Sequence, residues 1–246
     1  MADQNASKPG PADRAFSVPA QGTLASPYLA PRFYEDAIAQ GRHRAIVGGR
    51  WDETGRLQMQ LLLKAGLKPH HRLLDIGAGA LRLGCRAVPY LNPGHYWATD
   101  ASGALMRHGR ATELADPERL PQSHLVEDAE FNFPGIPPVD MAIAFAVFTH
   151  LPAPALDSTL MTLAARFPDL GTVLVTVFLA PDDSAGKAHR QPDGVVTHPD
   201  RPPYHRTQAS VDAAASTAGF LPAWSDIQLP RGQRCAVLQR ESTALP

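Results

Sequence analysis

The chain has 246 residues, of which 44% are hydrophobic and 19% are charged, and this is enough to build one α/β domain around a large core. Its formal net charge of −1 gives no support for nucleic acid or an anionic membrane as a partner, because such binders carry a strong basic excess. The two cysteines, Cys85 and Cys235, fit no metal-ligand spacing and indicate no disulfide framework, so we expect no metal site.

The first 30 residues are rich in Pro, Ala, Ser and Gly without sustained periodicity, which predicts a disordered tail. The N-terminus lacks the charged leader and apolar segment that direct secretion. No apolar stretch of the chain reaches the roughly 18 residues that a membrane span needs. We therefore expect a cytoplasmic protein without membrane contact, whose residues 31–246 form a single domain.

Two helices are predicted before the first strand. Residues 32–45 are compatible with a short helix, and residues 53–65 carry leucines on one face and stop at Gly66. Apolar residues at this spacing, closed by glycine, are typical of an amphipathic helix.

The next segment is the most informative of the chain. An apolar run, Leu73–Ile76, contains Asp75 and turns on Gly77, Ala78 and Gly79 before a helical pattern near 81–90. Strand, glycine turn and helix bring bare backbone amides and a helix N-terminus against a polar ligand. A side chain at Gly77 or Gly79 would stand between ligand and main chain. The segment therefore predicts a nucleotide- or nucleoside-cofactor site.

The spacing narrows the choice of cofactor. A dinucleotide fingerprint starting at Gly77 would need glycine at position 82, where Arg82 stands, and a phosphate-binding loop fails because Gly84 is followed by Cys85. A second apolar run, 96–99, ends in Asp100, where a carboxylate is placed to accept both hydroxyls of a ribose. NAD and S-adenosylmethionine sites share this placement, so Asp100 alone does not discriminate between them.

Helical and extended patterns alternate along most of the remaining chain, which argues for a parallel sheet covered on both faces, an α/β fold. The predicted elements are strand 95–100, helix 103–114, strand 123–127, strand 139–146, helix 154–166, strand 172–178 and a last helix near 207–218.

The segment from Pro181 to Tyr204 interrupts this pattern with five prolines and no apolar periodicity, which predicts a long connection without regular structure. Such connections inside a domain are usually either functional or disordered. This one follows the fifth strand, at the sheet edge where open α/β folds bind ligands. Two interpretations are open: a flap that covers the substrate, and a plain mobile loop.

Four segments resemble the class I S-adenosylmethionine-dependent methyltransferases, and the resemblance extends from about residue 45 to about 240. Leu73–Gly79 is similar to the family's first motif, Asp100 to its ribose-binding acid, and Glu127-Asp128-Ala129 to the end of its third strand. Val139–Leu151 is similar to the fourth strand and, with Phe148-Thr149-His150-Leu151, to the turn found in small-molecule methyltransferases. The visible departure is Leu81, where the family usually has a third glycine.

The resemblance implies a Rossmann-like, seven-stranded, mostly parallel sheet with helices on both faces and a C-terminal antiparallel strand, within a hairpin near 221–228 and 234–239. It also implies in-line transfer of a methyl group from S-adenosylmethionine to an O, N or C nucleophile of a small-molecule acceptor. The implied cofactor-binding residues are Trp51, Asp75, Gly77, Ala78, Gly79, Arg82, Asp100, Ala101, Asp128, Ala129 and Phe145.

Each of these residues has a structural alternative. Asp75 could hold the glycine turn, Asp100 could cap a helix, and Asp128 could form a turn. Trp51 could cover the cofactor or the acceptor, and Phe145 could lie along the methionine part of the cofactor. Alternatively, both are core residues. Arg82 is placed to meet a carboxylate of cofactor or acceptor, or lies on a solvated helix face.

His150 is the candidate for catalysis, because an imidazole at the end of the fourth strand titrates near neutral pH and a hydroxyl or protonated-amine acceptor must lose a proton. As a base or an acceptor-orienting group it would contact substrate. Alternatively, it caps the helix near Pro152 or packs beneath the cofactor. Tyr204 and His205, at the exit of the long connection, are further candidates for acceptor contact.

Two other functions stay open. A nicotinamide-dependent oxidoreductase is disfavoured by Arg82, and a non-catalytic relative that acts through a partner is disfavoured by intact Gly77, Gly79 and Asp100. No Asn/Asp-Pro-Pro-aromatic motif follows the fourth strand, which, with the near-neutral charge, disfavours nucleic-acid substrates. The acceptor and the oligomeric state are not indicated.

Overall fold

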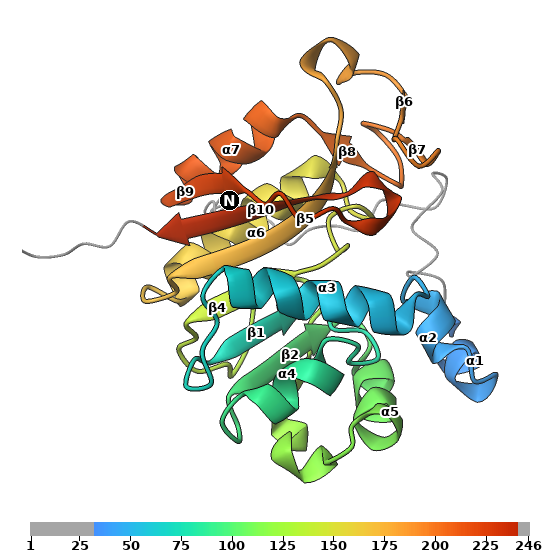
Figure 1. The fold of residues 1–246 in the computed structure, drawn as a ribbon, viewed down its shortest axis with the longest axis vertical. Helices are drawn as coiled ribbons and strands as arrows, with labels where there is room; N and C mark the ends of the chain where they lie inside the picture. The colour runs from blue at the N-terminus through green and yellow to red at the C-terminus, as the bar shows by residue number, and fades with distance from the viewer. Residues whose placement is uncertain (1–31, 241–246) are drawn as a thin grey trace, which may run out of the picture.

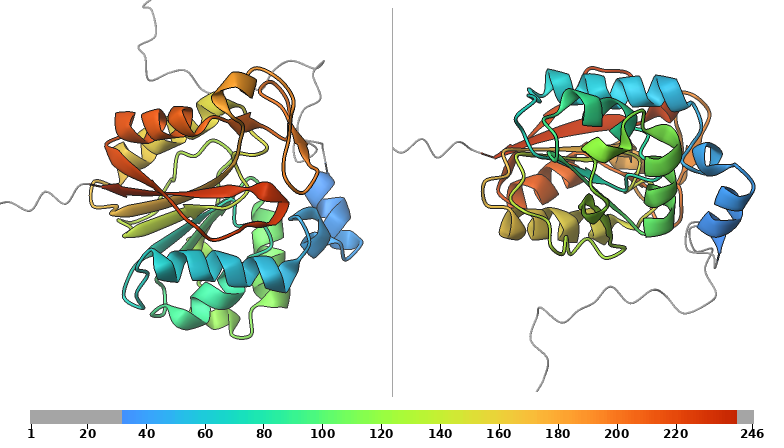
Figure 2. Two further views of the ribbon diagram at one scale, coloured as in Figure 1. Left: turned by 45° about the horizontal axis from the view of Figure 1, so that its top comes forward. Right: turned by 90° about the horizontal axis from the view of Figure 1, so that it is seen from below.

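A computed structural model describes residues 32–240 of the chain (Figure 1). The tail predicted for residues 1–30 lies outside the described residues. A central sheet runs through the molecule, with α3, α4 and α5 on one face and α6 and α7 on the other (Figures 1 and 2). The covering helices are α3 Trp51–Lys64, α4 Gly84–Tyr90, α5 Gly103–Glu113, α6 Ala153–Arg166 and α7 Gln208–Thr217.

The sheet has the strand order β3-β2-β1-β4-β5-β10-β9. The first five of these strands are parallel, and β10 lies antiparallel between β5 and β9. A short eighth strand, β8 (His205–Arg206), pairs with β5 in parallel. The main strands are β1 Leu73–Ile76, β2 Tyr96–Asp100, β3 Leu125–Glu127, β4 Met141–Ala144, β5 Thr172–Leu179, β9 Phe220–Trp224 and β10 Arg234–Arg240. The predicted α/β, Rossmann-like sheet with a C-terminal antiparallel strand is confirmed.

The apolar residues of the strands fill two cores, one on each face of the sheet. All four residues of β1 and all four of β4 are buried, as expected for strands covered on both faces. Side-chain caps start two of the helices: the Ser102 hydroxyl accepts from Leu105 N–H, and the Thr207 hydroxyl from Ser210 N–H. Among the helices within residues 32–240, none has the length and apolar character that a membrane crossing requires.

Two predicted helices differ from the structure. Residues 32–45 form two short helices, α1 Phe33–Ala39 and α2 His43–Ile46, because the chain turns at Gly41 with φ +65°. The helix predicted from residue 81 begins only at Gly84. Leu81 takes a left-handed φ of 63°, which a regular helix cannot accommodate.

The connection after β5 has regular structure, so that part of its prediction is wrong. It contains a two-stranded antiparallel hairpin, β6 His189–Arg190 and β7 Val196–Thr197. Polar side chains hold it in place of an apolar core: the buried Gln191 amide donates to Leu179 O at 3.0 Å and to Thr197 Oγ1 at 3.1 Å. Apolar periodicity therefore carried no signal for this hairpin.

Gly109 of α5 packs directly against the backbone that follows the glycine turn. A Cβ at Gly109 would lie 2.2 Å from Ala80 O and 2.9 Å from Ala80 Cα. We predict that Gly109→Ala lowers the free energy of unfolding by about 1–3 kcal/mol through overpacking, although alanine is intrinsically the better helix former by about 1 kcal/mol. Chemical denaturation of both proteins measures this difference in the free energy of unfolding.

The matched control is Gly186→Ala, because a Cβ at Gly186 meets nothing within 4 Å. Equal or higher stability of Gly109→Ala relative to this control would show that α5 does not press on the turn.

Candidate functional site

A cavity of about 680 Å³ opens at the carboxyl ends of the parallel strands. This is the edge at which open α/β sheets bind ligands, near the point between β1 and β4 where the strand order reverses. The sequence-predicted residues on its wall are Gly77, Ala78, Gly79, Arg82, Asp100, Ala101, Asp128, Ala129, Phe145 and His150. Asp75, Trp51, Tyr204 and His205 are not among the lining residues.

The glycine turn after β1 has the shape expected of it but not the free amides. Gly77 and Gly79 have φ of +70° and +56°, and a Cβ would lie 2.5 Å from Val147 Cγ2 and 2.7 Å from Val47 Cγ1, respectively. The N–H groups of Gly77 and Ala78 donate to Thr99 O at 2.8 and 3.0 Å. The expectation of bare amides is therefore wrong, and the turn offers a ligand close approach to its backbone.

Asp100, at the end of β2, is tied to this turn. Its Oδ2 accepts from Gly79 N–H and its Oδ1 from Ser102 N–H, both at 2.9 Å. Burial raises the pKa of Asp100, although these two amide hydrogen bonds act to lower it. A carboxylate has about four lone-pair sites, so each oxygen keeps one for a ligand in the cavity.

Asp128, after β3, forms a turn while also lining the cavity. Its carboxylate accepts from Glu130 N–H at 3.1 Å and Phe133 N–H at 2.7 Å, and its own N–H donates to Asp100 O at 2.9 Å. The neighbouring cavity wall is largely apolar and includes Leu105, Ala129 and Phe131.

Asp75 and Trp51 contact other side chains of the protein and do not line the cavity. Asp75 is a buried residue of β1, where the Tyr96 hydroxyl donates to its carboxylate, and burial raises its pKa to about 7. The Arg44 guanidinium lies 5.1 Å from the centre of the Trp51 ring. Neither side chain lines the cavity, because one points into the core and the other packs beneath the N-terminal segment.

Arg82 lines the cavity and fixes part of its rim. Its Nη1 donates to Val47 O at 2.9 Å and Gly49 O at 3.2 Å. Its guanidinium lies 5.9 Å from the centre of the Phe145 ring. Arg82 is thus buried against protein carbonyls and does not lie on a solvated helix face.

His150 is held in the cavity by a tight turn after β4. Ala146 has a left-handed φ of 60°, its N–H donates to Thr176 Oγ1 at 2.7 Å, and His150 N–H donates to Val147 O at 3.0 Å. Burial, with a smaller effect of Arg231, lowers the pKa of His150 to about 4. α6 starts at Ala153, and its N-cap residue Pro152 makes no side-chain cap hydrogen bond. The helix-cap interpretation of His150 stays a prediction.

Tyr204 and His205 belong to the framework around the cavity. The buried His205 imidazole pairs through Nδ1 with Thr197 Oγ1 at 2.9 Å and through Nε2 with Ala185 O at 3.2 Å. Tyr204 N–H donates to Thr149 O at 2.7 Å. These contacts join the β6–β7 segment to the turn that carries His150.

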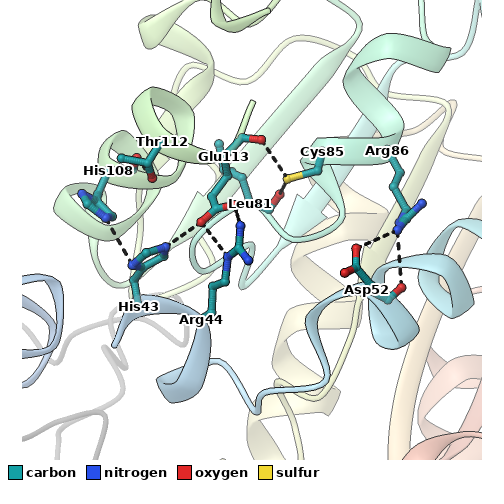
Figure 3. A network of polar contacts seen from close by, with 9 residues as sticks. All are labelled: His43, Arg44, Asp52, Leu81, Cys85, Arg86, His108, Thr112 and Glu113. Atoms are coloured by element: carbon teal, nitrogen blue, oxygen red, sulfur yellow. Dashed lines mark hydrogen bonds and ion pairs between the residues drawn. The ribbon is translucent and has the colours of Figure 1, made fainter. Parts of the chain in front are cut away.

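The N-terminal helices form another wall, fixed by one carboxylate (Figure 3). Glu113, at the end of α5, accepts from Arg44 Nε at 2.8 Å and pairs with His43 Nε2 at 2.6 Å. Its side chain is only 5% exposed. His43 Nδ1 lies 3.3 Å from His108 Nε2. This network positions α2 and the segment after it beside the cavity.

Sequence reasoning missed much of the cavity wall, because most of these residues carry no motif and come from distant segments. The exceptions lie in the segment 139–151, whose motif was identified although these residues were not assigned to the site. The further lining residues are Tyr34, Val47, Gly48, Arg50, Thr54, Gln58, Leu105, Phe131, Ala146, Val147, Thr149, Leu151, Phe178, Val195, Arg201, Pro202, Pro203, Pro230, Arg231 and Gln233.

Within residues 32–240, no three His, Cys, Asp or Glu side chains gather closely enough to hold a metal ion.

No protein-family model and no curated protein sequence matches the chain. Solved structures do match it. A 1,6-didemethyltoxoflavin-N1-methyltransferase from Burkholderia thailandensis, with 1,6-didemethyltoxoflavin and S-adenosylhomocysteine bound, shares 17% identity over 91% of this chain and 94% of its own (TM-score 0.56). Magnesium protoporphyrin IX methyltransferase from Synechocystis PCC 6803, with S-adenosylhomocysteine bound, shares 15% identity over 85% of this chain and 97% of its own (TM-score 0.56). Streptomyces venezuelae DesVI shares 16% identity over 84% of this chain and 97% of its own (TM-score 0.54). The chain shares the fold of these proteins.

The Glu113 network predicts an acid-sensitive N-terminal wall. The bond from Arg44 lowers the pKa of Glu113, and burial lowers the pKa of His108. Both groups therefore stabilise the fold fully above their ordinary pKa values and lose this contribution as the pH falls through the depressed values. We predict that acidification from pH 7 to pH 3 lowers the hydrogen-exchange protection factors, which are corrected for the intrinsic pH dependence of amide exchange, in residues 33–49 before it lowers them in the sheet.

Glu113→Gln should produce the same local change at pH 7, with exchange in residues 33–49 about tenfold faster, because a hydrogen bond to a charged group contributes about 1.5–3 kcal/mol. Glu118→Gln is the control, since the Glu118 side chain is 87% exposed and pairs with Arg110 at the surface. Equal exchange in both variants would contradict a positioning role for Glu113.

His150 gives a second pH prediction. Because its pKa is lowered to about 4, its imidazole is neutral from pH 5 upward and is protonated only as the pH falls through 4. An NMR titration of the ring, assigned by comparison with His150→Gln, should place its midpoint near pH 4, whereas an unperturbed histidine titrates near 6.5. A midpoint at 6 or above would contradict a buried imidazole beside Arg231.

Proposed function

We propose that the protein is an S-adenosylmethionine-dependent methyltransferase that acts on a small-molecule acceptor. The observation that carries this proposal is the convergence of the glycine turn, Asp100 and Asp128 on one half of a single cavity. Its volume of about 680 Å³ falls within the range of sites for drug-sized ligands. The fold shared with solved methyltransferases supports the same assignment.

The residues present fit the cofactor. Gly77 and Gly79 line the cavity without side chains, and a Cβ at either would collide with Val147 or Val47, which line it beside them. An adenosyl group would therefore meet main chain and not side chain at these two positions. The remaining lone pair on each oxygen of Asp100 suits the two ribose hydroxyls. Ala101, Ala129, Leu105 and Phe131 provide apolar surface for an adenine ring, with Asp128 at its border.

The methionine end of the cofactor would lie toward Phe145 and Arg82, between the glycine turn and the N-terminal wall. Arg82 holds Val47 and Gly49 by their carbonyls, which keeps that wall over the cavity. In this arrangement the wall excludes water from the reacting centre, a condition for efficient transfer.

S-adenosylmethionine supplies an already electrophilic methyl group. The chain must therefore align the acceptor and, where needed, accept its proton. The imidazole of His150 is neutral at pH 7, because burial lowers its pKa to about 4, and its turn is fixed by Thr176 and Val147. We assign His150 the role of orienting the acceptor nucleophile and receiving its proton.

We further propose that residues 31–246 act as one catalytic domain in the cytoplasm, because one sheet runs through the described part of the chain. Two alternatives have direct tests. Parallel titration with NAD and S-adenosylhomocysteine separates an oxidoreductase from a methyltransferase. Incubation with labelled methyl donor and a cell extract separates an enzyme from a non-catalytic relative, which would label no product.

The proposal predicts the effect of removing the carboxylate of Asp100. Calorimetry should detect uptake of S-adenosylhomocysteine by the unmodified chain. Asp100→Ala should weaken it about tenfold to a hundredfold, because hydrogen bonds to a charged group contribute about 1.5–3 kcal/mol.

Asp169→Ala is the matched control, because Asp169 is exposed and lies outside the cavity wall. Its affinity should equal that of the unmodified chain. Absence of uptake by the unmodified chain, or equal affinities in both variants, would overturn the proposal.

A further inference from the structure

The strand order divides the cavity into two halves. The proposed cofactor half is built from segments that follow β1, β2 and β3. The other half is built around β5: Arg201 precedes β8, which pairs with β5, and Arg231 precedes β10, which pairs with β5 on its other edge. In Figure 1, β6 and β7 lie at the upper right, whereas α5 lies at the bottom. His150, after β4, stands between the halves.

The wall of the cavity carries unequal charge. Its arginines are Arg50, Arg82, Arg201 and Arg231, and its carboxylates are Asp100 and Asp128. Both carboxylates belong to the cofactor half. The β5 half thus holds two positive side chains and no carboxylate, and it faces a cofactor that itself bears a positive sulfonium.

Two of these four arginines, Arg50 and Arg82, have protein partners, and the other two do not have one among the described residues. Arg82 donates to backbone carbonyls, and Arg50 lies 3.7 Å from Glu53. The side chains of Arg201 and Arg231 make no hydrogen bond or ion pair with any other residue of the described range 32–240. Both are exposed residues that line the cavity, so their guanidinium groups, without an acceptor among residues 32–240, are available to a ligand.

The backbone of Arg231 adds a second, independent observation. Arg231 has φ 64° and ψ 16°, a left-handed conformation that is unfavourable for a residue with a Cβ. Glycine would adopt it freely, and Gly232 follows directly with φ +74°. Strained backbone of this kind clusters at ligand sites, where the side chain has a use.

We propose that the methyl acceptor is an anionic small molecule with an apolar body, whose carboxylate, sulfonate or phosphate group is bound by Arg201 and Arg231. Phe178, Pro203 and Pro230 line the same half and suit the apolar body, while a guanidinium fork suits a planar or tetrahedral anion. This inference rests on the proposed function, which assigns the other half of the cavity to the cofactor.

The neutral state of His150 fits such an acceptor. Arg231 is one of the causes that keep the pKa of His150 low. A bound anion would oppose the field of Arg231 and make the imidazole a better proton acceptor when substrate is present. The same anion would thereby fix the acceptor and strengthen the base beside it.

The test uses two fluorescent probes with one aromatic framework. 8-Anilinonaphthalene-1-sulfonate carries a sulfonate, and N-phenyl-1-naphthylamine lacks it. Each is titrated into the full chain saturated with S-adenosylhomocysteine. We expect saturable binding of the sulfonate, weakened about tenfold or more by Arg201→Gln and by Arg231→Gln, with unchanged binding of the neutral probe.

Arg234→Gln is the matched control, because Arg234 is exposed on β10, three positions from Arg231, and does not line the cavity. It should bind the sulfonate as the unmodified chain does. Arg231→Gly should also weaken sulfonate binding while its melting temperature stays equal or rises, since glycine relieves the left-handed backbone. This variant separates loss of the anion site from loss of the fold.

Absence of saturable sulfonate binding, or equal weakening by Arg234→Gln, would overturn the proposal. So would unchanged binding in both Arg201→Gln and Arg231→Gln. Uptake of S-adenosylhomocysteine is measured separately by calorimetry, so a chain that binds this ligand but fails the probe test keeps its proposed function and loses only the anionic acceptor. A chain that takes up no S-adenosylhomocysteine loses the proposed function itself.

Discussion

The hydrogen bond from Gly79 N–H to Asp100 Oδ2, at 2.9 Å, is the interaction on which the cofactor half of the cavity depends. It ties the turn after β1 to the end of β2, and it requires Gly79 to stand at φ +56°, where glycine is favoured. The N–H groups of Gly77 and Ala78 are bonded to Thr99 O, so all three amides of the turn are used within the protein while the turn lines the cavity. The remaining lone pairs of Asp100 are the polar part of this lining.

The sequence was sufficient for the sheet and for this half of the cavity. Runs such as Met141–Ala144 are apolar on both faces, which identifies strands covered on both sides. Residues at the carboxyl ends of such strands meet at one edge, so Gly77, Asp100 and Asp128 could be brought together without coordinates. How the amides of the turn are bonded could not be predicted, because that depends on the register between β1 and β2.

The other walls depend on contacts between segments far apart in the chain. Glu113 binds His43 across 70 positions, and no local pattern in either segment signals the pair. His205 was a candidate for acceptor contact, but its ring is buried and pairs with Thr197 and Ala185. Arg231 follows a proline in a short turn and carries no motif. Its importance emerges only from its left-handed backbone and its place opposite the cofactor half.

A crystal structure of the chain with S-adenosylhomocysteine tests the central claim most directly. The account predicts that both ribose hydroxyls lie within hydrogen-bonding distance of the Asp100 carboxylate, that the adenosyl group contacts the Gly77 backbone, and that the sulfur faces His150. Adenosine bound elsewhere, or bound in the cavity without contact to Asp100, would contradict it.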